Sequence, residues 1–253
     1  MKKTINLSAL LIAVIMLLTS CSGIADIFGP DYKKITNEIF TNYIEMNVTV
    51  TTIHGTEESG YDNQGSGVIY GLEYGYYYCL TNAHVVEDDP EYQATSYVIT
   101  DCYGTEYKGT LVHSDYDRDL AVIKFRRGTE SLCAVKLADS DPKIGTNVAV
   151  LSTSKHLINA VTYGKIKDYE TVKISDKKGN DDTRVTFPVI WHNAPMWDGA
   201  SGSVLLNMDM ELVGINYAVG TNEEGQFVYA FAVSVSHVRE YLEENNLMKN
   251  VKV

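Results

Sequence analysis

Short apolar runs, many of them alternating with polar residues, recur along most of the chain and are separated by glycine, aspartate and asparagine. Alternation with period two is typical of a strand with one buried face, and the separating residues favour turns. The pattern predicts twelve strands: 47–53, 66–70, 76–80, 96–101, 105–112, 119–125, 148–152, 159–167, 183–191, 203–206, 212–218 and 227–233. Strands of this number and spacing suit an all-β fold of two six-stranded antiparallel barrels.

Helical periodicity is confined to the two ends of this strand-rich region. After Pro30, four apolar residues spaced by three and four predict a helix with one apolar face: Tyr32, Ile35, Ile39 and Tyr43. Near the C-terminus, Ser236 is a candidate N-cap, and three apolar residues follow it at helical spacing: Val238, Tyr241 and Leu242. Both short helices are expected to pack on the barrels.

The first twenty residues have the features of a secretory signal peptide. Lys2 and Lys3 precede an apolar stretch over 7–18, which is too short to span a bilayer because about 20 residues are needed. The following Leu18-Thr19-Ser20-Cys21 resembles the lipobox of bacterial lipoproteins, which implies cleavage before Cys21 and acylation of that residue. An ordinary signal with an incidental cysteine is the alternative. Either interpretation places the mature chain outside the cytoplasm, with 21–45 as a tether and the first helix.

Charge and cysteine content limit the possible partners. The chain has 33 acidic and 21 basic residues, and its formal net charge is −12. Such an acidic surface repels phosphate backbones, so nucleic acid is not expected as a partner. Cys79, Cys102 and Cys133 remain besides Cys21. An odd number argues against a complete disulfide framework but leaves one pair possible.

Candidate chemistry comes from a histidine, an aspartate and a serine, in that chain order. His84 lies in Thr81-Asn82-Ala83-His84-Val85-Val86, Asp119 begins Asp119-Leu120-Ala121-Val122-Ile123-Lys124, and Ser201 lies in Gly199-Ala200-Ser201-Gly202. A serine hydroxyl is a poor nucleophile at neutral pH and needs a base, which in turn needs a carboxylate to fix its tautomer. Glycine at 199 permits a turn in which the N–H groups of 199 and 201 converge on an oxyanion.

Each of these motifs has a simpler interpretation when it is taken alone. Gly-x-Ser-Gly occurs in ordinary turns, a histidine between apolar residues is often a hydrogen-bonded core residue, and an aspartate at a strand edge needs no catalytic role. The combination in this order favours a catalytic site. His192, nine residues before Ser201, is open to two interpretations as well: a cleft residue, or a structural hydrogen bond on its strand.

The motifs resemble those of trypsin-like serine proteases of the bacterial high-temperature-requirement (HtrA) type. Further segments that carry the resemblance are Gly65-Ser66-Gly67-Val68-Ile69, Gly104-Thr105-Glu106-Tyr107, Leu137-Ala138-Asp139-Ser140-Asp141, Lys143-Ile144-Gly145, Asn193-Ala194-Pro195, Val213-Gly214-Ile215-Asn216 and Tyr229-Ala230-Phe231-Ala232-Val233. Together they cover about residues 45–245, the extent of a protease domain.

The resemblance implies how the site is assembled. It places His84 and Asp119 in a first barrel over 46–140 and Ser201 in a second barrel, with the C-terminal helix, over 141–253. Ser201 would be the nucleophile, His84 the base and Asp119 its orienting carboxylate, with the N–H groups of Gly199 and Ser201 as the oxyanion hole. The substrate pocket would include Pro195, Asn216, Tyr217 and Ala218. Neither a metal nor an organic cofactor is implied.

The nucleophile loop differs from the family pattern. Where the family usually has Asn-Pro-Gly-Asn-Ser-Gly-Gly, this chain has Trp197-Asp198-Gly199-Ala200-Ser201-Gly202-Ser203. Ala200 stands where activated digestive proteases carry an aspartate that pairs with a new N-terminus, so that activation switch is not available. We expect a lipid-anchored, extracytoplasmic serine endopeptidase that cleaves exported or unfolded polypeptides. The alternative is a pseudoprotease that binds peptides in the cleft. The sequence makes no prediction of the oligomeric state.

Overall fold

The computed structural model describes residues 30–55, 60–88, 91–129, 131–154, 157–174 and 183–249. Tyr32–Val253 cluster as one unit, to which both barrels belong. The predicted signal peptide and Cys21 lie outside the described residues. Within the described ranges, no helix is both long enough and apolar enough to cross a membrane.

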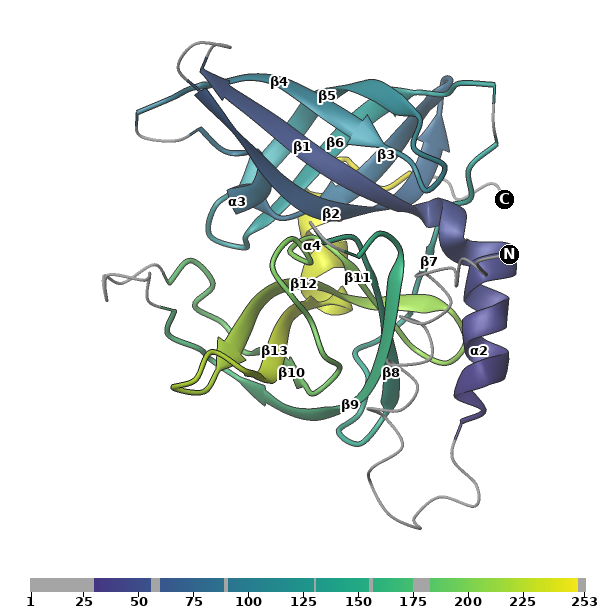
Figure 1. The fold of residues 1–253 in the computed structure, drawn as a ribbon, viewed down its shortest axis with the longest axis vertical. Helices are drawn as coiled ribbons and strands as arrows, with labels where there is room; N and C mark the ends of the chain where they lie inside the picture. Colours follow the sequence, from purple (N-terminus) through teal and green to yellow (C-terminus); the bar gives the residue numbers. More distant parts are fainter. Residues whose placement is uncertain are drawn as a thin grey trace, which may run out of the picture. The chain divides into compact units, whose positions relative to one another are not determined.

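The first barrel consists of six antiparallel strands that close in the order β1-β2-β3-β6-β5-β4 (Figure 1). These strands are β1 (Asn47–Gly55), β2 (Gly60–Glu73), β3 (Tyr76–Thr81), β4 (Ala94–Thr100), β5 (Glu106–Asp115) and β6 (Leu120–Arg126). A one-turn helix, α3 (Ala83–Val86), follows β3 directly. Closure pairs every strand on both sides, so this barrel has no open sheet edge.

The second sheet has seven strands in the order β11-β8-β9-β10-β13-β12-β7, and a further β11–β12 pairing closes six of them into a barrel. They are β7 (Lys136–Leu137), β8 (Asn147–Ser152), β9 (Ala160–Glu170), β10 (Val189–His192), β11 (Val204–Leu206), β12 (Glu211–Thr221) and β13 (Phe227–Ser234). The predicted pair of six-stranded antiparallel barrels is confirmed. Strand β7, which pairs in parallel with β12, was not predicted, because two residues cannot show a period.

Three strands of the first barrel are buried on both faces. On β2, Ile69 belongs to the core of the first barrel, whereas Val68 and Tyr70 belong to the apolar cluster shared with the second barrel. Strands β3 and β6 divide their side chains between the same two clusters. Successive strand residues point to opposite faces, so burial on both faces gives a continuous apolar run. This arrangement brings the ends of β3 and β6 to the junction of the barrels.

The N-terminal helix packs on the second barrel. Helix α2 (Tyr32–Glu38) continues through a π-helical turn, η1 (Ile39–Tyr43), and a 3₁₀ turn, η2 (Ile44–Met46), into β1. The Tyr32 and Tyr163 ring centroids are 4.5 Å apart, and Thr36 Oγ1 lies 2.7 Å from the Tyr163 hydroxyl on β9. Tyr32, one residue of the predicted apolar face, therefore packs on β9.

The C-terminal helix begins earlier than predicted. Helix α4 (Val235–Glu244) has Ser234 as its N-cap, so the proposed N-cap, Ser236, lies inside the helix. The N–H of Ser236 donates to Asp141 Oδ1 at 2.9 Å. A carboxylate from the segment between β7 and β8 thus accepts a hydrogen bond from an N–H in the first turn of the helix, the role that an N-cap side chain often fills.

Candidate active site

His84 and Asp119, separated by 35 positions in the chain, are joined by two hydrogen bonds. His84 lies on α3, and its Nδ1 is 2.8 Å from Asp119 Oδ2. The backbone N–H of His84 donates to the other carboxylate oxygen, Oδ1, at 3.0 Å. The Asp119 side chain is 1% exposed and that of His84 is 29% exposed. The carboxylate therefore fixes both the position and the tilt of an imidazole that solvent can still reach.

The backbone around Asp119 is held by further contacts. Asp119 immediately precedes β6 and has φ +49°, a left-handed conformation that aspartate adopts more readily than most residues. Its carbonyl accepts a hydrogen bond from Asn82 Nδ2 at 2.8 Å. Since Asn82 directly precedes α3, one polar side chain joins the Asp119 backbone to the segment that carries His84.

The loop that carries Ser201 is held from both barrels. In the second barrel, Gly202 N–H donates to Asn216 O at 2.8 Å, and Asn216 N–H donates to Ser203 O at 2.9 Å. From the first barrel, Ser66 N–H donates to Ser201 O at 2.7 Å. Gly199 and Gly202 have φ values of +91° and +83°, which L-residues with side chains rarely adopt. The glycines predicted to shape this loop are therefore required by its conformation.

The N–H groups within this loop differ in their hydrogen bonding. Ala200 N–H donates to Trp197 O at 3.0 Å, whereas no described residue accepts a hydrogen bond from Gly199 N–H or Ser201 N–H. Two unengaged donors thus flank one that is engaged. This is the arrangement that an incoming oxygen with developing negative charge would need.

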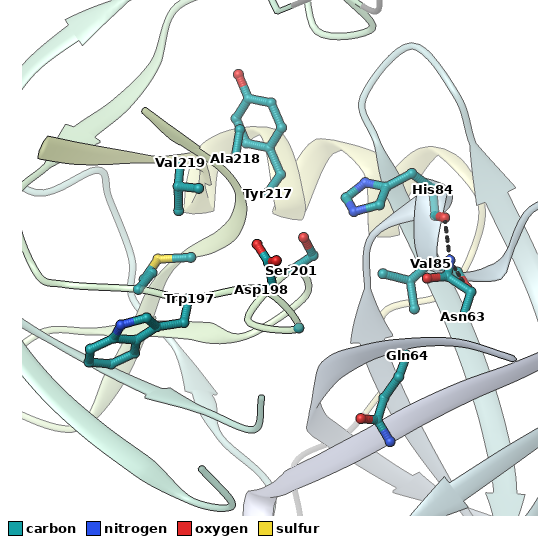
Figure 2. A pocket seen from close by; sticks show the side chains of 12 residues that line it. Asn63, Gln64, His84, Val85, Trp197, Asp198, Ser201, Tyr217, Ala218 and Val219 are labelled. Carbon is teal, nitrogen blue, oxygen red and sulfur yellow. Dashed lines mark hydrogen bonds between the residues drawn. The ribbon is translucent and has the colours of Figure 1, made fainter. Parts of the chain in front are cut away.

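His84 and Ser201 border one cavity of about 360 Å³ (Figure 2). Figure 2 shows the imidazole of His84 on the first barrel facing the hydroxyl side of Ser201 on the second. No hydrogen bond joins the two side chains among the interactions drawn there. In proteins without a bound substrate such bonds are often long and shorten in the reacting complex. The structure therefore brings all three predicted residues to one place, with two of them hydrogen-bonded.

The predicted pocket residues occupy two kinds of position. Tyr217 and Ala218 line the cavity. Pro195 and Asn216 do not appear among its lining residues: the Pro195 carbonyl accepts from Thr162 Oγ1 at 2.8 Å, and Asn216 is fully buried.

Four apolar residues outside the predicted pocket set also line the cavity: Val85, Met196, Trp197 and Val219. Trp197 is 43% exposed and Val219 is 38% exposed. A large aromatic side chain four residues before the nucleophile was the available signal for Trp197.

A second cavity, of about 170 Å³, is lined by His84 and Asp119 together with Arg184 and Tyr217. Arg184 pairs through both terminal nitrogens with the two carboxylate oxygens of Glu87, just after α3. The Tyr217 hydroxyl is buried and has no hydrogen-bond partner among the described residues. Burial of Tyr217 and the negative charge of Asp119 raise the pKa of the Tyr217 hydroxyl, which is therefore protonated at neutral pH.

His192 makes the structural hydrogen bond that was one of its two predicted roles. It is fully buried on β10, and its Nε2 lies 2.8 Å from Asn216 Oδ1. Asn216 Nδ2 in turn donates to Ser203 Oγ at 3.0 Å. Burial lowers the pKa of His192 from 6.5 to about 4, although the bond to Asn216 opposes this shift. The neutral imidazole thus hydrogen-bonds to Asn216 on β12, and Asn216 in turn bonds to Ser203, two positions after the nucleophile.

The lowered pKa predicts a loss of stability in acid. Because the folded state disfavours protonation, the stability that neutral His192 provides is complete above pH 6.5 and falls progressively as the pH is lowered toward about 4. The full effect is about 3 kcal/mol in the free energy of unfolding, at 1.36 kcal/mol per pKa unit. NMR of the His192 ring in the folded protein should show it neutral at pH 5, and urea titrations should show weaker folding there than at pH 7. A midpoint above pH 6 for the folded ring would contradict the prediction.

Comparison with known proteins gives one matching family model, the trypsin-like peptidase domain, over residues 65–215. The serine protease Do-like HtrA of Bacillus subtilis is 34% identical over 190 residues, which are 74% of this chain and 39% of that protein. The periplasmic serine endoprotease DegP of Escherichia coli K12 is 29% identical over 187 residues, 73% of this chain and 36% of that protein. The chain thus spans less than two fifths of the length of either relative.

Among solved structures, a protease from M. tuberculosis in its active form superposes with a TM-score of 0.68. The match covers 88% of this chain and 90% of that one, at 18% sequence identity. At this identity the match shows a shared fold.

Proposed function

The chain belongs to the family of trypsin-like peptidase domains, and on that premise we propose that it is a serine endopeptidase of the HtrA type. The observation that carries the proposal is the pair of hydrogen bonds by which buried Asp119 holds His84 at the cavity that Ser201 lines. A carboxylate, an imidazole and a hydroxyl in this order are the parts of an activated serine nucleophile.

The hydrogen bonds of Asp119 define the proton positions for this reaction. An ionised carboxylate accepts but cannot donate, so the imidazole proton resides on Nδ1 of His84 and leaves the lone pair of Nε2 unoccupied. Nε2 then takes the proton of Ser201 as Oγ attacks the scissile carbonyl, and later returns it to the leaving amine. Asp119 stabilises the imidazolium that exists between these two steps.

The developing negative charge on the substrate oxygen is stabilised by Gly199 N–H and Ser201 N–H. No described residue accepts a hydrogen bond from either group, so both can donate to the substrate oxygen without breaking a bond within the described structure. Preorganised donors of this kind contribute about 3–4 kcal/mol each to the stabilisation of the transition state.

The substrates are polypeptides in extended, unfolded segments. The exposed side chains of Trp197 and Val219 border the cavity and offer an apolar surface to a substrate side chain. Relatives that carry the names periplasmic serine endoprotease and serine protease Do-like HtrA support a polypeptide substrate and a site of action outside the cytoplasm.

A fluorophosphonate probe tests this function on the protein as it exists. The probe reacts with a serine hydroxyl only where a base activates it, and its adduct mimics the tetrahedral intermediate. We expect mass spectrometry to locate one adduct, on Ser201, with Ser203 and Ser66 unmodified as internal controls. Absence of the adduct from the folded protein, together with measurable binding of an unfolded polypeptide, would favour the pseudoprotease alternative.

We also propose that Cys21 anchors the protein to a membrane through attached lipid, on the evidence of Leu18-Thr19-Ser20-Cys21 after the apolar stretch. The mature chain is expected to incorporate labelled fatty acid and to fractionate with membranes, because two or more acyl chains anchor a protein stably. Cys21→Ser should abolish both properties, whereas Cys102→Ser should change neither. A soluble, unlabelled wild-type protein would contradict the lipid anchor.

A further inference from the structure

Ser66, on β2 of the first barrel, contacts the nucleophile loop through its side chain as well as its backbone. Its hydroxyl lies 3.0 Å from Gly199 O and 2.8 Å from Thr153 O, and it accepts a hydrogen bond from Thr153 N–H at 2.9 Å. Ser66 is fully buried, so these contacts do not compete with bulk water. The proposed mechanism does not use this hydroxyl.

The carbonyl that Ser66 contacts belongs to the peptide between Gly199 and Ala200. The other side of the same peptide, Ala200 N–H, donates to Trp197 O. This peptide lies between the two N–H groups that no described residue engages, those of Gly199 and Ser201. Its orientation therefore determines the directions in which these two donors can point.

Restraint from outside the loop is needed at this position. Gly199 has φ +91°, and a residue without Cβ loses more conformational freedom on folding than any other. Within the loop, the Ala200–Trp197 bond holds only the nitrogen side of the peptide. The Ser66 hydroxyl supplies the restraint on the carbonyl side.

We propose that Ser66 is a positioning residue for the oxyanion hole: its hydroxyl holds the Gly199 carbonyl so that Gly199 N–H and Ser201 N–H face the same substrate oxygen. This inference rests on the proposed peptidase function. One hydroxyl proton serves two acceptors, Gly199 O and Thr153 O, so the loop is also joined to the end of β8. The backbone bond from Ser66 N–H to Ser201 O is independent of the side chain and persists without it.

The test compares Ser66→Ala with Tyr70→Phe. Tyr70, also on β2, donates a buried hydrogen bond of the same length, 3.0 Å, to the carbonyl of Leu247, which is not a lining residue of the cavity. Both variants lose one buried hydroxyl, and both should unfold at somewhat lower temperature. Only Ser66→Ala is expected to lower kcat, by about tenfold to a hundredfold, with KM within about twofold of wild type. This loss is smaller than the removal of a donor would cause, because the backbone bond remains.

A second measurement does not depend on catalysis. Amide hydrogen exchange of Ala200 N–H should be faster in Ser66→Ala than in wild type or Tyr70→Phe, because the peptide has lost its restraint on the carbonyl side. Ser66→Cys, with a weak S–H donor of similar size, should give intermediate values and serves as the second variant if Ser66→Ala folds poorly.

The outcomes separate the inference from the function on which it rests. Wild-type kcat in Ser66→Ala, or unchanged exchange of Ala200 N–H, would overturn the role of Ser66 while leaving the peptidase intact. A wild-type protein that neither turns over substrate nor reacts with the fluorophosphonate would instead overturn the proposed function. The exchange measurement would then still decide whether Ser66 holds the loop.

Discussion

Asp119→Asn is expected to slow peptide hydrolysis by about 10⁴-fold, or about 5.5 kcal/mol in activation free energy. The two hydrogen bonds of Asp119 give the reason. The backbone N–H of His84 requires an acceptor, so the new amide must turn its oxygen toward that group and its NH₂ toward Nδ1 of His84. Nδ1 then becomes the acceptor, the imidazole proton moves to Nε2, and no lone pair remains to take the proton of Ser201.

Asp117→Asn is the matched control, since Asp117 is exposed and lies in the same turn two residues earlier. It removes the same charge and should leave kcat within about twofold of wild type. Steady-state kinetics on an unfolded protein substrate measure both variants, with circular dichroism to verify their folding. Equal activity of Asp119→Asn and wild type would exclude Asp119 from the proton-transfer site.

The strand pattern predicted the architecture well, because the burial of each barrel strand is visible in a short stretch of its own sequence. Continuous burial on β2, β3 and β6 appears in the sequence as short apolar runs between turn residues. The predicted strand over 183–191 was too long: of the residues described there, regular pairing is confined to Val189–His192. Arg184, inside the predicted strand, is instead held by its ion pair with Glu87, a contact across 97 positions that no local pattern contains.

Individual residues of the candidate site were predicted only where they belong to a recognisable sequence motif. His84, Asp119 and Ser201 stand in motifs whose residue types follow from the chemistry, and the structure places all three at one cavity or hydrogen-bonded beside it. Which residues line that cavity depends on the conformation of the loop that carries Ser201. Trp197 lines it, whereas Asn216 is buried in bonds with His192 and Ser203. Which side chain of a turn faces the solvent depends on long-range packing, and no local sequence rule supplies it.

Gly202→Ala is expected to lower the free energy of unfolding by about 3–5 kcal/mol, and the unfolding temperature by about 10 °C. Two penalties combine at this position. An alanine at φ +83° is strained, and its Cβ would lie 2.1 Å from Ser66 O and 2.4 Å from Thr81 Oγ1. Thr81 Oγ1 donates to that same carbonyl at 2.8 Å, so the methyl group must separate the two barrels locally or move the nucleophile loop.

Gly104→Ala isolates the backbone strain, the first of these two penalties. Gly104 has a nearly equal φ, +87°, but a Cβ there would meet nothing within 4 Å. This control should cost only the backbone strain, about 1–2 kcal/mol, and should keep full activity. Gly202→Ala should in addition lose at least a hundredfold in kcat, because displacement of Ser201 by about 1 Å is enough for such a loss. Calorimetry and kinetics on the two variants measure the difference, and equal unfolding temperatures would show that the loop can move away from Ser66 at no cost.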